Sequence, residues 1–240
     1  MNSFGKLILS AATIAAICLA MMGGCPLAAD GPPSDVRFVN MATTDQMNPS
    51  RAVLDGIDFG SVGRYNPSLF QVVNSGSKSM SITDSIAATV YSNGSEDIPS
   101  DHTVNLVSVG NSVTSVDLVK VGEDKSMSMP GAGEVRIHFI NGCDSFAVDI
   151  YILPVGTPIA GSPWVSNLAY RGDTVLSEAI TGPHDFVMCP AGTTTEAARS
   201  TVDLIGGKVF LSTVISPSVA SSPKKSSADF KTFDFHQTAF

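Results

Sequence analysis

The residue types that most often carry out catalysis occur in this sequence, but their spacing does not match a reacting set. A serine nucleophile needs a strained turn with a base in reach, and the chain has no G-x-S-x-G segment. Zinc chemistry needs paired histidines, and neither H-x-x-x-H nor H-E-x-x-H occurs. The histidines are isolated: His102, His138, His184 and His236. We therefore predict a protein that is not an enzyme and needs no cofactor.

The setting of each histidine also points to an ordinary surface residue. Val135, Ile137 and Phe139 alternate with polar residues, so His138 is expected to face away from the core beside Arg136. His184 follows Gly182-Pro183, which is typical of a turn.

Two clusters of oxygen-bearing side chains keep calcium open as a ligand. Asn93 to Asp97 with Asp101 are expected to share one loop, and Asp55 with Asp58 forms the other cluster. Carboxylate and amide oxygens suit Ca²⁺, but neither cluster has the D-x-D-x-D-G spacing of a calcium loop. Solvated turns are the favoured interpretation, and no metal site is predicted.

Aromatic rings could bind a sugar by stacking. Trp164, the single tryptophan, with Tyr170 and Tyr151 would supply such a platform. Their positions on alternating runs favour core and inter-sheet packing instead. A ligand platform of Trp164 and Tyr170 is therefore the less favoured hypothesis.

The first residues have the pattern of an export signal. Lys6 precedes an uncharged, largely apolar stretch, residues 7–22, which is short of the roughly 20 residues that span a bilayer. The next segment, Met22-Gly23-Gly24-Cys25, resembles the bacterial lipobox, although leucine is more usual than Met22. The resemblance predicts a signal peptide over residues 1–24 and a diacylglyceryl group on Cys25. A cut after Ala29 fits less well, because Leu27 is not small.

Lipidation of Cys25 would tether the mature chain to a membrane, since two or more acyl chains anchor a protein stably. Residues 25–34 are expected to form a short extended tether. Pro26 follows the cysteine, and the absence of the aspartate that favours inner-membrane retention in Gram-negative lipoproteins favours the outer membrane. We expect a cell-envelope protein and leave its periplasmic or surface face open.

Cysteine usage fits export. Cys18 leaves with the signal peptide and Cys25 receives the lipid, so the folded region holds only Cys143 and Cys189. In an oxidising compartment such a pair is expected to form a structural disulfide. A redox or metal role is disfavoured, because there is no C-x-x-C.

Composition narrows the partners and the fold class. The chain of 240 residues has a formal charge of −8 and is 43% hydrophobic, which argues against both nucleic-acid binding and disorder. Ser, Thr, Gly and Asn dominate the polar residues, and this balance favours strands and turns. We therefore expect an all-β protein.

Short segments recur in the same order at a nearly constant offset. Phe38-Val39-Asn40 recurs as Phe139-Ile140-Asn141, and Ser61 to Tyr65 lines up with Ser166 to Tyr170. A third match sets Gly76, Met80 and Ile82 against Gly182, Phe186 and Met188. These matches predict two homologous domains.

Each repeat contains short period-two runs separated by turn signals such as Asn93-Gly94. The pattern predicts two tandem immunoglobulin-like β-sandwich domains, over residues 35–121 and 134–216, with a barrel as the alternative. Residues 122–133, rich in Gly and Ser, are expected to be a linker.

Residues 217–240 are expected to form a C-terminal tail that ends in aromatic residues. A terminal phenylalanine such as Phe240 is typical of outer-membrane barrels, but Thr238 and His236 occupy positions that would be apolar in a last barrel strand. We expect these aromatic residues to dock on the second domain.

Five segments of the second repeat form a longer pattern, which the first repeat carries in degenerate form. They are V-R-x-x-F-I-N from Val135, A-V-D-I-Y-I from Ala147, W-V-S-N-L-A-Y from Trp164, C-P-A-G-T-T-T from Cys189 and G-G-K-V-F from Gly206. The pattern resembles a family of exported bacterial domains of unknown function that occur as tandem copies in envelope proteins. The resemblance implies a β-sandwich fold and an exported location, and it supplies no catalytic residues.

Two functional hypotheses follow. The first is a non-enzymatic, lipid-anchored envelope protein that acts as a structural or interaction module, with a membrane and an envelope protein as its partners. The alternative is a module that binds carbohydrate or a surface polysaccharide.

Overall fold

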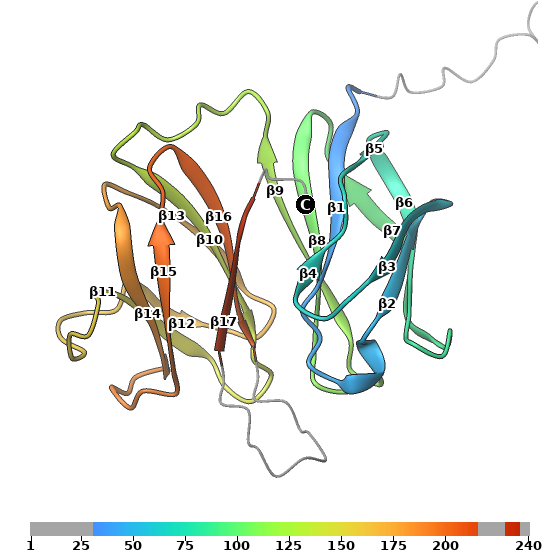
Figure 1. Ribbon diagram of the computed structural model, residues 1–240. Helices are drawn as coiled ribbons and strands as arrows, with labels where there is room; N and C mark the ends of the chain where they lie inside the picture. The colour runs from blue at the N-terminus through green and yellow to red at the C-terminus, as the bar shows by residue number, and fades with distance from the viewer. Residues whose placement is uncertain (1–30, 216–228, 236–240) are drawn as a thin grey trace, which may run out of the picture.

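The computed structural model describes residues 31–215 and 229–235, and these residues fold almost entirely into β-strands (Figure 1). The single helical element in these ranges is a 3-10 turn, η1 (Asp45–Met47). No helix among the described residues is long and apolar enough to cross a membrane. The predicted all-β class is confirmed. The predicted signal peptide and Cys25 lie outside the described residues.

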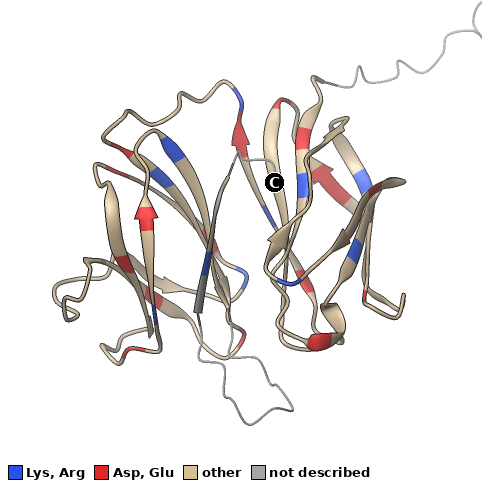
Figure 2. Cartoon of the chain, in the orientation of Figure 1, with Lys and Arg blue, Asp and Glu red and all other residues tan. Residues whose placement is uncertain are grey.

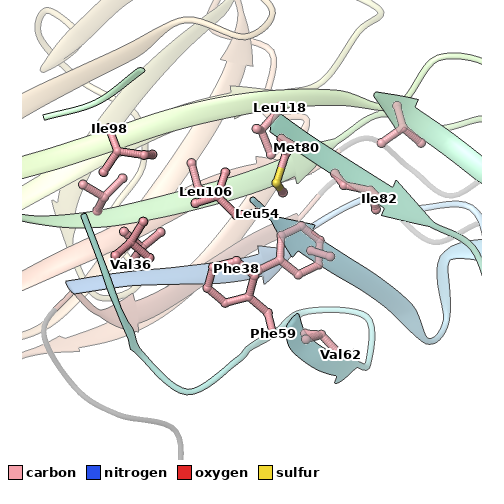
Figure 3. Packing of buried hydrophobic residues seen from close by; sticks show 14 of the residues in the cluster. Val36, Phe38, Leu54, Phe59, Val62, Met80, Ile82, Ile98, Leu106 and Leu118 are labelled. Carbon is pink, nitrogen blue, oxygen red and sulfur yellow. The ribbon is translucent and has the colours of Figure 1, made fainter. Parts of the chain in front are cut away.

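The first domain is a sandwich of two sheets. One sheet has the order β4-β1-β8-β9, with β5 also paired to β1, and the other has the order β3-β2-β6-β7. Figure 3 shows the core between them, where Val36, Phe38 and Leu106 are fully buried. The strands are β1 (Ser34–Asn40), β2 (Ser50–Leu54), β3 (Ile57–Val62), β4 (Asn66–Pro67), β5 (Gln71–Val73), β6 (Gly76–Thr83), β7 (Thr89–Ile98), β8 (His102–Val109) and β9 (Asp117–Asp124).

The second domain repeats this topology. Its sheets have the orders β13-β10-β16-β17 and β12-β11-β14-β15, and its core contains Phe139, Ile150 and Phe186. The first strand of each domain pairs in parallel with a later strand, β1 with β8 and β10 with β16. The strands are β10 (Val135–Gly142), β11 (Val148–Pro154), β12 (Val165–Leu168), β13 (Asp173–Glu178), β14 (Gly182–Pro190), β15 (Ala198–Leu204), β16 (Lys208–Ile215) and β17 (Asp229–Asp234). Two tandem β-sandwich domains, as predicted, are therefore present.

The backbone conformation of Gly76 and Gly182 explains why both repeats have glycine at this position. Gly76 begins β6 and Gly182 begins β14, with φ angles of 102° and 81°. Residues with a Cβ rarely adopt this left-handed region, so glycine is favoured at both strand starts. The second match is out of register by one residue, because the residue that corresponds to Val62 is Leu168: their carbonyls accept from Asn40 and Asn141, respectively.

The two domains pack sheet against sheet. A separate hydrophobic cluster joins the β1, β8 and β9 side of the first domain to β10 and β16 of the second. Its members are Val39, Met41, Val107, Val109, Val119 and Val121 from the first domain, and Ile140, Val209, Leu211, Ile215 and Phe235 from the second. The molecule thus has four stacked sheets, and the two inner sheets are covered on both faces. This explains why β8 and β16 are buried almost without interruption.

Two predicted boundaries differ from the observed strands. β9 runs to Asp124, so Gly122 to Asp124 belong to the sheet and not to the predicted linker 122–133. The predicted tail 217–240 contains β17, which pairs with β16 along six residues. Phe235 is fully buried, in line with the expected docking of the last aromatic residues, whereas Phe240 lies outside the described residues.

The predicted turn at Asn93-Gly94 is wrong. These residues lie inside β7, where the pairing with β6 changes register between Lys78 and Met80. A bulge accommodates an extra residue without ending the strand, so a turn-forming dipeptide here does not produce a turn.

Candidate functional site

The structure does not bring Trp164 and Tyr170 together as a ligand platform. Trp164 is 37% exposed and precedes β12, whose first residue Val165 enters the core of the second domain. Tyr170 instead packs on the interdomain cluster, and its hydroxyl donates to Asp117 at 3.2 Å. Burial and the nearby carboxylate raise the pKa of the Tyr170 hydroxyl. The packing interpretation therefore fits Tyr170, while Trp164 is a partly exposed single ring.

The predicted disulfide is a second correction, because both cysteines are free and buried. Cys143 belongs to the core between the sheets of the second domain. Cys189 packs with Tyr151, Leu153 and Val187 on the opposite face of the outer sheet. Cys189 follows the core residue Met188 in β14, and neighbouring residues in a strand point to opposite faces. The Cys189 thiol therefore lies on the far side of the outer sheet from Cys143. Burial raises the pKa of the Cys189 thiol, which disfavours the reactive thiolate.

His184 lies within β14 and not in the predicted turn. His138 differs more from its expected surface setting. It faces away from the core of its own domain, as expected, but the first domain covers it and leaves it only 6% exposed. Its Nε2 lies 2.8 Å from the Glu123 carboxylate. Its ring stacks on Phe235 with the ring centroids 4.6 Å apart. The interdomain packing thus turns an expected surface residue into an interface residue.

Asp55, Asp58 and Glu96, which belong to the two predicted oxygen clusters, make ion pairs or hydrogen bonds with neighbouring side chains. Asp58 makes an ion pair with Arg51 at 2.5 Å, and Asp55 lies 3.6 Å from Lys78. Glu96 accepts from Tyr91 and Asn93 within the bulged strand, and burial raises the pKa of Tyr91 to about 12. In residues 31–215 and 229–235, no group of three potential metal-ligating side chains converges.

Charged contacts link the domains at both ends of the interdomain cluster. At one end, Glu123 of β9 is 4% exposed and accepts from Arg136 of β10 at 3.1 Å as well as contacting His138. At the other end, Asp117 of β9 receives the hydroxyl of Tyr170 and lies 3.4 Å from Arg171. A hydrophobic interface flanked by charged contacts, of which those at Glu123 are buried, holds two domains in one arrangement. This interdomain interface was not predicted from the sequence, because the contacts of the interface join residues of different repeats.

An open groove in the first domain is a candidate for ligand binding among the described residues. It is lined by residues 59–63 of β3 and residues 66–69 of the β4–β5 region, and it has a volume of about 510 Å³. A smaller hollow of about 310 Å³ shares Ser61 with it. Both sizes fall near the lower range of small-molecule sites, which begins at about 300 Å³.

The groove forms where the first domain departs from the second. In the second domain the strand that pairs with β10 is continuous, β13, over six residues. The equivalent strand in the first domain is split into β4 and β5. Ser68 lies in the break: its backbone donates to the carbonyl of Phe38, and its hydroxyl accepts from the backbone of Phe38 at 3.0 Å. A side chain therefore replaces part of the β-ladder at this point.

The chemistry of the groove is neutral. Its side-chain polar groups are the hydroxyls of Ser61 and Ser68 and the amide of Asn66, and its apolar lining includes Pro67 and Leu69, of which Leu69 is 57% exposed. No acidic, basic or histidine side chain lines it. Such a surface can hydrogen-bond a neutral polar ligand, and it has no group suited to general acid–base chemistry.

No protein-family model matches the chain, and no curated protein matches it. Among solved structures, the chain is similar to a carbohydrate-binding module of family CBM26 from Eubacterium rectale Amy13K, which was solved in complex with maltoheptaose. The alignment has 8% identity and a TM-score of 0.26, and it covers 86% of this chain and 98% of that chain. A TM-score of this size establishes neither a shared fold nor a shared ligand.

Proposed function

We propose that this chain is a non-enzymatic, lipid-anchored envelope protein whose two β-sandwich domains act together as a structural or interaction module. The observation that carries this proposal is the interdomain cluster, which joins the inner sheets through eleven buried apolar residues. Large hydrophobic interfaces between domains oppose relative motion. The tandem copies therefore form one rigid body that can present surfaces at a fixed spacing.

The anchor is supported by the leader pattern and by Met22-Gly23-Gly24-Cys25, and the outer membrane is favoured by Pro26. The test is Cys25→Ala in the native host, followed by membrane fractionation and mass measurement of the N-terminal peptide. We expect the wild type to sediment with membranes and to carry a lipid mass, and the variant to lose the lipid. Unchanged membrane association of the variant would contradict the anchor.

The interaction role is tested by cross-linking the native protein on intact cells and identifying what is captured. Reproducible links to particular envelope proteins would support the module. Efficient labelling without a protein partner would shift support to the second candidate function.

The second candidate is binding of a neutral carbohydrate or surface polysaccharide in the groove of the first domain. Its support is the neutral, hydroxyl- and amide-lined surface around Ser61 and Asn66, at the point where β4 and β5 are split. We expect Ser61→Trp to fill the groove and to abolish retention on envelope polysaccharide. Ser95→Trp, on the exposed part of β7, is the matched control and should bind as the wild type does. Equal retention of both variants would remove this candidate.

A further inference from the structure

The strand directions bring three separate segments to one end of the molecule. β1 and β8 begin at this end, and so do β10 and β16, because each pair is parallel. The end of β9, beside the start of β8, contacts the start of β10 through Glu123 and Arg136. The first described residue, Gly31, therefore lies at the same end as the interdomain loop, residues 125–134, and the turn at residues 205–207 (Figure 1).

Hydrogen bonds and an ion pair hold these segments together. Lys125 donates to the carbonyl of Pro33 at 3.3 Å and makes an ion pair with Asp35 at 3.0 Å. On the other side of the loop, the backbone of Gly207 donates to the carbonyl of Glu134 at 2.8 Å. The loop is thus fixed to the start of β1 at one end and to the β15–β16 turn at the other.

This end carries exposed apolar side chains. Met127 and Met129 in the loop are 49% and 50% exposed, and Ile205 in the adjacent turn is 58% exposed. Residues 126–133 contain no charged residue, and the loop between β9 and β10 is mostly tan in Figure 2. Transfer of long apolar side chains from water to the boundary between lipid headgroups and acyl chains lowers the free energy, and an uncharged loop carries no charge that would oppose it.

The length of chain before Gly31 limits where this end lies. Five residues lie between Cys25 and Gly31, and the six residue-to-residue steps span at most about 20 Å when the chain is fully extended. A lipid on Cys25 therefore keeps this end, rather than the opposite one, close to the bilayer. The opposite end carries the turn between β6 and β7, where Ile86 is 74% exposed.

We propose that the interdomain loop and Ile205 form a membrane-contact surface that lies on phospholipid and holds the molecule end-on to the bilayer. The inference rests on the lipid anchor of the proposed function. Because the whole chain has a formal charge of −8 and the contact is apolar, the contact does not depend on attraction to anionic lipid and is insensitive to salt.

The test places one tryptophan in the loop of the full lipoprotein. Trp164→Phe removes the native tryptophan, and Met129→Trp then reports on the loop. The matched control is Ile86→Trp in the same background, an exposed apolar position at the other end of the molecule. Both proteins are reconstituted into phosphatidylethanolamine–phosphatidylglycerol vesicles that contain a nitroxide-headgroup lipid as quencher.

We expect the fluorescence of the Met129→Trp protein to fall by about half or more in these vesicles, and that of the control to remain unchanged. Raising the salt concentration should not restore the lost fluorescence. Equal quenching at both positions, or none at Met129→Trp, would overturn the contact surface.

The mass of the N-terminal peptide distinguishes failure of the lipid anchor from failure of the membrane-contact surface. A lipidated Cys25 with an unquenched loop refutes the contact surface and leaves the anchor intact. An unlipidated Cys25 refutes the anchor, and the contact surface with it.

Discussion

Asn40 and Asn141 occupy the same position in the two domains and show what a single buried amide does. Asn141 Nδ2 donates to the carbonyls of Phe146 and Leu168, at 3.2 and 2.8 Å. Asn40 Nδ2 donates in the same way to the carbonyls of Met47 and Val62. Each amide therefore binds two main-chain carbonyls from separate segments of its own domain. This explains why the repeated F-x-N segment ends in asparagine.

Asn141→Ala should destabilise the second domain by about 2 kcal/mol, because it leaves buried backbone groups without partners. The measurement is the free energy of unfolding from denaturant titration. Asn74→Ala, at an exposed loop position, is the control and should change stability little. Equal stability of the two variants would mean that the carbonyls of Phe146 and Leu168 find other hydrogen-bond donors.

The state of the thiols is a second prediction at the scale of residues. In the folded protein, without reductant, neither Cys143 nor Cys189 should react with an alkylating agent, because both are buried. After unfolding in denaturant, still without reductant, both should be alkylated, and mass measurement should show two adducts in the folded region. If both cysteines stay unmodified in denaturant and react only after reduction, the disulfide between Cys143 and Cys189 is present.

At the scale of elements, one loop covers the outer face of the second domain. The segment between β11 and β12 lies over Tyr151, Val187 and Cys189, with Ile159 packed on them. Asp185 of β14, 2% exposed, fixes this segment by accepting from the backbone of Gly156 at 2.9 Å. Arg199 of β15 donates both to Asp185 and to the carbonyl of Thr157.

Asp185 should make this element sensitive to acid. The hydrogen bonds from Thr201, Gly156 and Arg199 lower the pKa of the Asp185 carboxyl. A lowered pKa stabilises the folded state above the unfolded value of about 3.9, and this contribution is lost as the pH falls through the folded pKa.

Asp185→Asn should therefore be less stable than the wild type at neutral pH. The difference should shrink as the pH falls below about 4. Unfolding midpoints measured from pH 7 downward would check this, with Asp203→Asn at an exposed position of β15 as the control. A difference that is constant with pH would show that the charge of Asp185 is not what stabilises the loop.

At the scale of the whole molecule, the decisive feature is that the two sandwich cores are separate from the interdomain cluster. Leu211 is fully buried between the domains, and its neighbour Phe210 enters the core of the second domain. A change at Leu211 therefore perturbs the joining of the domains more than the folding of either one.

Leu211→Asp should separate the domains, because an unpaired carboxylate between apolar sheets is costly. We expect a larger radius of gyration by solution scattering and faster proteolysis of the interdomain loop, with strand content retained. Val155→Asp, at a residue that is 52% exposed, is the control and should behave as the wild type does. An unchanged radius for the Leu211 variant would mean that the charged contacts alone hold the domains together.

The sequence by itself determined the all-β class and the two similar domains, because period-two patterns and strand-start glycines are local properties of the chain. It also limited the enzymatic hypotheses, since catalytic motifs depend on spacing. The linker and tail boundaries were misplaced, because polar residues such as Glu123 and the residues of β17 gain their partners from distant strands.

Only the tertiary structure decided what joins the domains and where ligands could bind. His138 is buried because another domain covers its sheet, and the two cysteines lie apart because a sheet separates them. The groove exists because the strand that becomes β4 and β5 is broken, a difference from β13 that is visible only when the two domains are compared in space. Such properties depend on contacts between residues far apart in the chain, which no local pattern records.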